Sequence, residues 1–214
     1  GVIGMFFFGW AVLCEKFAVG NVCYALIGAA IPLMISGGFH VDGYMDTMDA
    51  FHSYQSREKK LEILKDSHIG AFAAIMLALY YMIDIAAISE IHTQKAVSAV
   101  AAVFFLARCF SGIAVMTLQP AKKEGLLYTF ASSAQKVRVK AALYFQAALC
   151  VAIMLLVSGW YGAAAIGAAL LSFFYFKKKS YKELGGITGD TAGFFVTVCE
   201  AAAAAAVAVA GYFL

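Results

Sequence analysis

The sequence predicts an all-α fold, a polytopic bundle of about seven transmembrane helices with a candidate active site at one rim. Three observations lead to this class. Hydrophobic residues make up 63% of the 214 residues and charged residues only 14%, a balance far too apolar for a soluble domain. The mean hydropathy is +0.82. Since one crossing needs about 20 apolar residues, this length allows roughly six to eight crossings.

Seven apolar segments account for the predicted helices, because backbone groups inside a bilayer must be hydrogen-bonded within their own segment. They are 1–13, 17–36, 69–89, 96–118, 141–158, 159–176 and 191–214. The junction Ser158-Gly159 predicts a tight helical hairpin. No repeat or linker divides the chain, so we expect one catalytic domain over residues 1–214. The sequence starts inside an apolar run without Met, so we expect the natural chain to have a further N-terminal part.

Basic residues gather in three polar stretches, 37–66, 119–140 and 177–190, which hold 13 of the 16 Lys and Arg residues. Threading the chain through seven helices puts all three stretches on the same side of the membrane. Basic loops are typical of the cytoplasmic side. We therefore expect these stretches, and the active site, at the cytoplasmic face of a bacterial or archaeal inner membrane.

The first polar stretch carries three aspartates, Asp42, Asp46 and Asp49. Spacings of four and three residues place them within roughly 60° of one another on a helix. Clustered carboxylates repel one another and need solvent or a cation to stay ionised. Mg²⁺ prefers oxygen ligands and keeps open positions for phosphate oxygens. A solvated acidic face is the alternative, but three of only 13 acidic residues within one short stretch favour a metal site.

The chain just before segment 69–89 combines four side chains suited to an anionic ligand. They are Lys65, Asp66, Ser67 and His68. Helix N-termini and basic side chains both favour negative charge, so this group predicts phosphate binding, with Arg57 as a further cation upstream. Capping of the helix by Asp66 or Ser67 is a structural alternative, and the two roles are compatible.

A glycine-rich turn, 185–191, follows the basic run 177–179. Glycines allow close backbone approach, and consecutive N–H groups can hold an oxyanion, which makes Gly186, Thr188 and Gly189 candidates for phosphate binding. Asp190 either extends the metal site or caps the last helix.

Two ionisable side chains, Arg108 and Glu200, lie inside apolar segments, where a charge is costly unless it is paired or faces a polar cavity. For Arg108 we expect a phosphate or carboxylate partner. Asp84 and Glu90 are expected at the opposite side, in interfacial positions. His40, beside the aspartates, is a candidate base or a hydrogen-bonding partner of a ligand.

Together these motifs resemble the cobalamin synthase family, integral membrane enzymes with adenosylcobinamide-GDP ribazoletransferase activity. The resemblance rests on the stretches 37–49, 65–70, 121–126 and 185–190, with Arg108 and Glu200. Their order and spacing agree over nearly the whole chain. The family has Arg where this chain has His68, and its members have a further N-terminal stretch.

The resemblance implies a reaction that joins adenosylcobinamide-GDP to α-ribazole or its 5′-phosphate, releases GMP and needs Mg²⁺. A ribose hydroxyl displaces a nucleotide from a diphosphate, which requires charge neutralisation and in-line alignment. The expected metal ligands are Asp42, Asp46 and Asp49, completed by Asp66 or Asp190. The expected catalytic residues are Asp46, Asp49 and His40. The expected phosphate ligands are Arg57, Lys65, Ser67, His68, Arg108, Gly186, Thr188 and Gly189.

Three other classes fit less well. A CDP-alcohol phosphotransferase has Ala-Arg soon after its Asp-Gly, whereas Asp42-Gly43 is followed here by Tyr44 and Met45. A prenyltransferase needs a second Asp-rich motif. A transporter carries its charges near the bilayer midplane, often with internal repeats. The expected partners are the two substrates and the lipid bilayer, with no nucleic acid; whether the chain forms a homo-oligomer stays open.

Overall fold

The computed structural model describes residues 1–121 and 136–213, and within these ranges the chain is all-α, as predicted. The described helices are α1 (Val2–Lys16), α2 (Asn21–Ser36), α3 (Phe39–His52), α4 (Arg57–Ile63), α5 (Ala71–Ile88), α6 (Gln94–Thr117), α8 (Lys136–Ser158), α9 (Trp160–Leu184) and α10 (Gly189–Gly211). Every one of the seven apolar segments is a helix. Of the motif 121–126, all but Ala121 lies outside the described residues.

Length and composition make this a multi-pass membrane protein. Among the described residues, α5, α6, α8 and α10 are long and apolar enough to cross a membrane. The pair α2 and α3, bent by 96°, could supply a fifth crossing. Helices α1 and α2 have 15 and 16 residues, short of the roughly 20 that a full crossing needs. Four to five of the seven predicted crossings are therefore supported.

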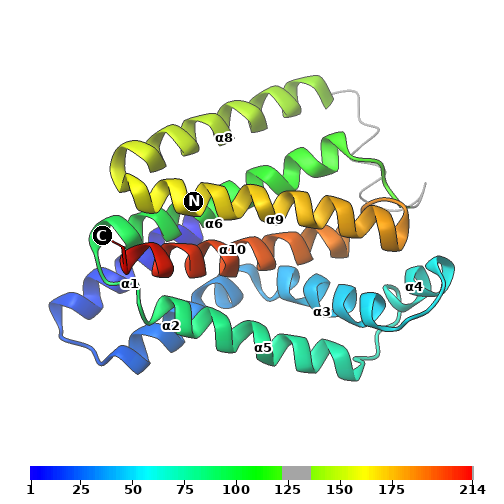
Figure 1. Ribbon diagram of the computed structural model, residues 1–214, viewed down its shortest axis with the longest axis horizontal. Coiled ribbons are helices and arrows are strands. Elements are labelled where there is room, and N and C mark those ends of the chain that lie inside the picture. Colours follow the sequence, from blue (N-terminus) through cyan, green and yellow to red (C-terminus); the bar gives the residue numbers. More distant parts are fainter. Residues whose placement is uncertain (122–135, 214) are drawn as a thin grey trace.

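Helix α10 is the central element of the bundle, packed against α9, α3, α6 and α5 (Figure 1). The apolar stretch of α10 is 72% buried, more than in any other candidate span. Its sequence explains this position, because Gly193 and the run of alanines at 201–206 present small side chains that let neighbouring helices approach closely.

The predicted hairpin between α8 and α9 is confirmed. Helix α8 ends at Ser158, α9 begins at Trp160, and Gly159 between them has φ +56°. Glycine takes up this left-handed conformation without the strain that a side chain would cause. The two helices then run back along each other, with Gly162 against the backbone of Met154.

The described parts of the three polar stretches gather at one end of the bundle, on the right of Figure 1. Helix α4 and the loop that follows it, the end of α6, the start of α8, the end of α9 and the start of α10 all lie there. Within the described ranges, the three stretches therefore lie at one end of the bundle. We call this end the rim.

A sharp bend between α2 and α3 directs α3 toward the rim. It is made by Gly37 and Gly38, with φ of +65° and +83°. Both values lie in the left-handed region, which glycine adopts at little cost and which commonly ends a helix. The glycine pair therefore sets the course of the helix that carries the aspartates.

Candidate active site

The site begins with a close contact between the backbones of α3 and α10. A Cβ atom on Gly43 would lie 2.8 Å from the carbonyl oxygen of Asp190. A Cβ atom on Gly193 would lie 3.2 Å from the carbonyl oxygen of His40, which also accepts a hydrogen bond of 3.2 Å from the Thr197 hydroxyl. The start of α10 is therefore pressed against the helix that carries the aspartates, although almost 150 residues separate them.

This contact brings four carboxylates together, those of Asp42, Asp46, Asp49 and Asp190. Asp46 is partly buried, and its carboxylate interacts electrostatically with the other three. The structure thus places Asp190, rather than Asp66, beside the three aspartates of α3. We call these four residues the carboxylate cluster. Like charges at such close range repel, so the cluster is unfavourable unless a proton or a cation compensates it.

The carboxylate cluster fits the way in which proteins bind Mg²⁺ together with a phosphate substrate. Within the described ranges, no group of three or more His, Cys, Asp or Glu side chains is arranged so that it could hold a metal ion. Mg²⁺ is, however, commonly bound by one or two carboxylates, with substrate phosphates and water as the remaining ligands. An all-carboxylate donor set at an accessible end of the bundle suits that mode.

Asp49 differs from the other members because both of its carboxylate oxygens accept hydrogen bonds from α5. Oδ2 accepts from the Gly70 N–H at 2.7 Å, and Oδ1 accepts from the Ala73 N–H at 2.8 Å. Asp49 therefore caps the N-terminus of α5, where free N–H groups need acceptors. The expectation that Asp66 or Ser67 caps this helix is wrong, because α5 begins only at Ala71 and a more distant carboxylate supplies the cap.

The segment between α4 and α5 exposes the remaining residues of the first polar stretch. His68 donates through its N–H and through Nδ1 to Asp66 Oδ1, at 3.1 and 2.6 Å. These hydrogen bonds hold the pKa of Asp66 below its usual value. Lys65 and Ser67 are exposed. Asp66 is thus engaged with His68 in a solvent-exposed pair.

Arg57 connects α4 with the glycine-rich turn. Its guanidinium lies against Gly185, at the space that a side chain there would need. Its Nη2 donates to the carbonyl of Ala121 at 3.5 Å. Gly185 has φ +72°, a left-handed conformation that favours glycine. The predicted cation is therefore held at the rim beside the predicted turn.

Some backbone groups of the glycine-rich turn form hydrogen bonds with the segment around Pro120. Ile187 pairs with the backbone on either side of Pro120, donating to Gln119 at 3.0 Å and accepting from Ala121 at 2.8 Å. A Cβ atom on Gly186 would lie 2.6 Å from the Gln119 carbonyl oxygen. Gly186 is thus explained by backbone packing against this pairing.

The start of α10 is fixed by a capping box. Thr188 Oγ1 accepts from the Thr191 N–H at 3.1 Å, and Thr191 Oγ1 accepts from the Thr188 N–H at 2.8 Å. The first helical residue, Gly189, is exposed, and it begins a turn whose N–H groups face the rim end of the helix. Gly189 and Asp190 therefore lie where an anionic ligand can approach a helix N-terminus.

An ion-pair cluster that sequence reasoning missed fastens α4 to α9. Lys60 and Lys179 donate to the two carboxylate oxygens of Glu183, at 2.5 and 3.1 Å. The hydrogen bond from Lys60, aided by Lys179, lowers the pKa of Glu183. Lys60 is buried although it belongs to a run of charged residues. Since Lys60 and Glu183 lie 123 positions apart, no local pattern could have revealed the pair.

Within the bundle, Arg108 of α6 forms an ion pair with Glu200 of α10, which confirms the expected carboxylate partner. Arg108 also donates to the Phe104 carbonyl at 2.6 Å. Asp84 is only 5% exposed, so its expected interfacial position is wrong. Helix α5 turns this residue inward against α10, within electrostatic reach of Glu200. His40 has a buried Nδ1 with no hydrogen-bond partner among the described residues.

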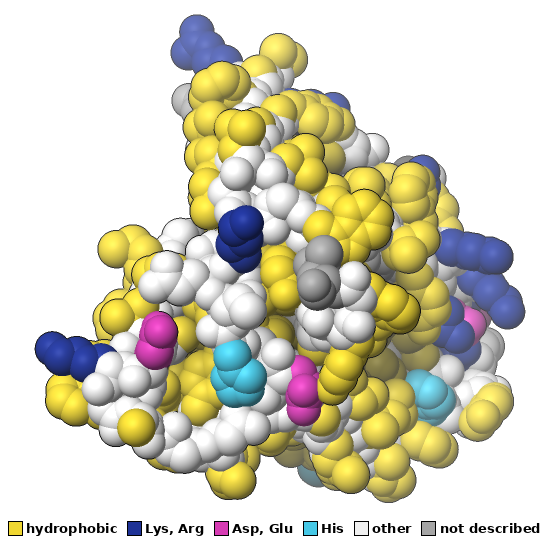
Figure 2. All heavy atoms as spheres, turned by 60° about the vertical axis from the view of Figure 1, so that its left-hand side comes forward, with side chains coloured by type: hydrophobic (Ala, Val, Ile, Leu, Met, Phe, Trp, Pro, Cys, Tyr) yellow, Lys and Arg dark blue, Asp and Glu magenta, His cyan; other side chains and the backbone are white. Residues whose placement is uncertain are grey.

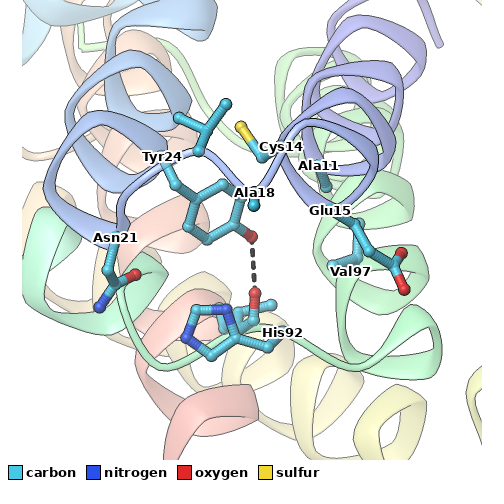
Figure 3. A pocket seen from close by; sticks show the side chains of 10 residues that line it. Ala11, Cys14, Glu15, Ala18, Asn21, Tyr24, His92 and Val97 are labelled. Atoms are coloured by element: carbon cyan, nitrogen blue, oxygen red, sulfur yellow. Dashed lines mark hydrogen bonds between the residues drawn. The ribbon is translucent and has the colours of Figure 1, made fainter.

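A cavity lies at the end of the bundle opposite the rim, far from the carboxylate cluster. It measures about 380 Å³ and is lined by residues of α1, α2 and the start of α6, with Glu15, Tyr24 and His92 at its walls (Figure 3). The Tyr24 hydroxyl donates to the carbonyl of Ile91 at 2.6 Å. Figure 2 brings this end forward and shows single charged and His side chains set apart on a largely apolar surface.

Fold and site together define a class: a multi-pass helical membrane protein with carboxylates and cations gathered at one end of its bundle. A family model described as cobalamin-5-phosphate synthase matches residues 1–208. The chain belongs to this family, as its motifs indicated.

Three relatives named adenosylcobinamide-GDP ribazoletransferase match most of the chain. The chain is 41% identical over 209 residues to an adenosylcobinamide-GDP ribazoletransferase of Lachnoclostridium phytofermentans, covering 98% of this chain and 80% of the relative. It is 30% identical over 201 residues to that of Azorhizobium caulinodans, covering 91% and 75%. It is 29% identical over 178 residues to that of Escherichia coli, covering 82% and 71%. No solved structure matches the chain.

Proposed function

We propose that the chain is an adenosylcobinamide-GDP ribazoletransferase of cobalamin biosynthesis whose catalytic centre is the carboxylate cluster. Family membership and the relatives' shared name support the activity. The observation that carries the location is the approach of Asp190 to Asp46, brought about by the contact between the Asp190 backbone and Gly43.

In the proposed reaction, a ribose hydroxyl oxygen of α-ribazole, or of its 5′-phosphate, attacks the phosphorus of adenosylcobinamide-GDP that bears the cobinamide. The new P–O bond forms as the bond from that phosphorus to the bridging oxygen of the diphosphate breaks. GMP leaves with that oxygen, and the hydroxyl proton passes to a protein carboxylate. Catalysis of this kind depends on alignment and on neutralisation of charge.

Mg²⁺ would be held by Asp42 and Asp190, where it would neutralise charge on the diphosphate and on the departing GMP, and Asp46 would keep its carboxylate for the hydroxyl proton. Asp46 is the better candidate for taking the hydroxyl proton than Asp49, because both oxygens of Asp49 already accept from α5. Proton uptake by one of four neighbouring carboxylates also relieves repulsion among them. Asp49 then acts by fixing α5 against α3. His40 remains a candidate hydrogen-bonding partner of the reacting groups.

Phosphate binding is assigned to the cations and N–H groups of the rim. Arg57 lies against the glycine-rich turn, and Gly189 opens α10, so a cation and a helix N-terminus lie close together. Lys65, Ser67 and His68 are exposed on the segment that enters α5, accessible to a substrate phosphate. Arg108, which lies deeper and is paired with Glu200, has further N–H donors to offer.

All seven apolar helices would lie in the membrane, with the shorter α1 and α2 and the Lys-ended α9 completing the bundle as one domain. The rim would face the cytoplasm. The 13 bases in the three polar stretches, against Lys16 and Lys95 on the other side, support this orientation.

The test of the activity is GMP release by purified protein in detergent, given adenosylcobinamide-GDP and α-ribazole 5′-phosphate, with and without Mg²⁺. We expect release that requires both the acceptor and Mg²⁺. Release without acceptor would indicate a hydrolase. Absence of release from folded protein would contradict the proposal and direct the test to CDP-alcohols and prenyl diphosphates.

A further inference from the structure

A cavity of about 500 Å³ lies in the angle between α2 and α3 and is closed on its third side by α5. Leu33 of α2, Phe39 and Met45 of α3, and Leu77 and Tyr81 of α5 form its apolar walls. Asp42, the first member of the carboxylate cluster, also lines it. The cavity therefore joins an apolar space to the proposed catalytic centre.

The charge of this cavity indicates what it can bind. Asp42 is the only charged side chain among the residues that line it, and no Lys or Arg is among them. The cations described at the rim lie elsewhere: Arg57 against Gly185, and Lys60 against Glu183. The cavity therefore offers a diphosphate no cationic side chain of its own. An uncharged apolar group that carries hydroxyls would instead bury its ring and offer hydrogen bonds to Asp42.

The shape of the walls suits a flat aromatic ring. Phe39 is 71% exposed on the side of the cavity formed by α3, and Tyr81 lines it from α5. Aromatic side chains bind planar heterocycles by stacking and by edge-to-face contact.

We propose that this cavity binds the aromatic base of the nucleoside acceptor and holds its ribose toward Asp42 and Asp46. The inference rests on the proposed function and adds to it an acceptor site. In-line displacement puts the attacking hydroxyl and the leaving nucleotide on opposite sides of the phosphorus. The base that lies beside the proton-accepting carboxylates is therefore the acceptor's base and not the guanine of the leaving GMP.

The test compares Phe39→Ala with Phe145→Ala, an exposed aromatic of α8 that lies outside the cavity and is 69% exposed. We expect Phe39→Ala to raise the KM for α-ribazole about 5- to 10-fold, with the KM for adenosylcobinamide-GDP unchanged. Phe145→Ala should change neither value. Calorimetric titration of α-ribazole alone into each protein should show the same loss of affinity, since KM alone can reflect later steps.

A second variant, Leu77→Trp, fills the cavity from α5 and should abolish use of the acceptor while titration of adenosylcobinamide-GDP still shows binding. A rise in the donor KM with Phe39→Ala would assign the cavity to guanine and overturn the proposal. Unchanged KM values in active Phe39→Ala and Leu77→Trp proteins would make the cavity a lipid-facing surface and also overturn it. Inactivity of the unmodified protein toward every acceptor would instead contradict the proposed function.

Discussion

The two ends of this bundle are built from the same kind of apolar helix, but carboxylates cluster at one end and are isolated at the other. At the rim, the backbones of α3 and α10 meet at Gly43 and Gly193, and four carboxylates come within electrostatic reach of one another. At the other end, the cavity beside Tyr24 holds a single carboxylate, Glu15, next to a neutral hydrogen-bonded wall (Figure 3). The two ends thus differ in whether the fold concentrates like charges.

The difference shows where the fold accepts an unfavourable arrangement. Clustered carboxylates cost stability, so a sequence selected for stability alone would keep them apart, as the far end does. Clusters of like charges that lower stability are typical of functional sites. Closeness at the rim depends on glycine, because any side chain at Gly43 would push α10 away from α3.

The largest effect is expected from Gly43→Val. Its side chain would enter the space held by the Asp190 backbone, so α10 must move and Asp190 must leave the cluster. We expect GMP release to fall at least about 100-fold, because a displacement near 1 Å is enough for such a loss. The free energy of unfolding should fall by about 1–3 kcal/mol. Gly9→Val on α1 is the control, since no atom lies within 4 Å of a Cβ there; equal losses in the two variants would contradict the account.

Comparison of Asp49→Ala with Asp46→Asn should show which carboxylate of the cluster contributes to stability and which to the reaction. Removing the carboxylate leaves the N–H groups of Gly70 and Ala73 without acceptors, so we expect a loss of about 1–2 kcal/mol in stability. Asp46→Asn should lose activity and keep its stability. Thermal unfolding followed by circular dichroism, together with GMP release, measures both. A stable but inactive Asp49→Ala protein would return Asp49 to the catalytic residues.

The ion-pair cluster of α4 predicts a pH effect at the rim. The pKa of Glu183 is lowered from its ordinary value of 4.5, so its pairing stabilises the fold above that pH and the stabilisation is lost as pH falls through the lowered pKa. The protection factors of the α4 amides, which correct for the intrinsic exchange rate at each pH, should therefore fall below about pH 4.5. Lys60→Met should lower the free energy of local unfolding of α4 by about 1–3 kcal/mol already at neutral pH. Exchange of α4 that is the same in both proteins at pH 7 would exclude this fastening role.

The smallest effect is expected from Asp66→Asn. Asp66 pairs with His68 in solvent, where the two side chains are 56% and 90% exposed, and such exposed pairs contribute little to stability. We expect unfolding to be unchanged and the Mg²⁺ concentration for half-maximal activity to shift less than about threefold. Asp190→Asn should shift it at least about tenfold. A larger shift in the half-maximal Mg²⁺ concentration for Asp66→Asn than for Asp190→Asn would make Asp66, and not Asp190, the metal ligand.

Local pattern was enough to predict part of this structure. The spacing of Asp42, Asp46 and Asp49 repeats with the helical period, so one helix face could be read directly. The seven apolar runs each coincide with a helix, and four to five of the crossings that they predicted are supported. An even number of crossings between the polar stretches predicted that these stretches lie at one end. The end of α9 was placed too early, at 176, because the lysines that follow suggested a loop although they are good helix formers.

Long-range contacts could not be predicted. The cap from Asp49 reaches N–H groups 21 and 24 positions away, and the partner of Lys60 lies further still. Asp84 was misplaced for a related reason. Helix α5 is apolar around most of its circumference, so its sequence did not reveal which face turns toward α10.

The central claim is that aspartates of α3 and α10 form one catalytic unit. A double-mutant cycle on Asp46→Asn and Asp190→Asn, with kcat/KM for GMP release measured at saturating Mg²⁺, tests it most directly. Residues that act as a unit are strongly non-additive, so we expect the double variant to be about as slow as the slower single variant. Losses that simply multiply would show that the two carboxylates act independently, which would contradict the account.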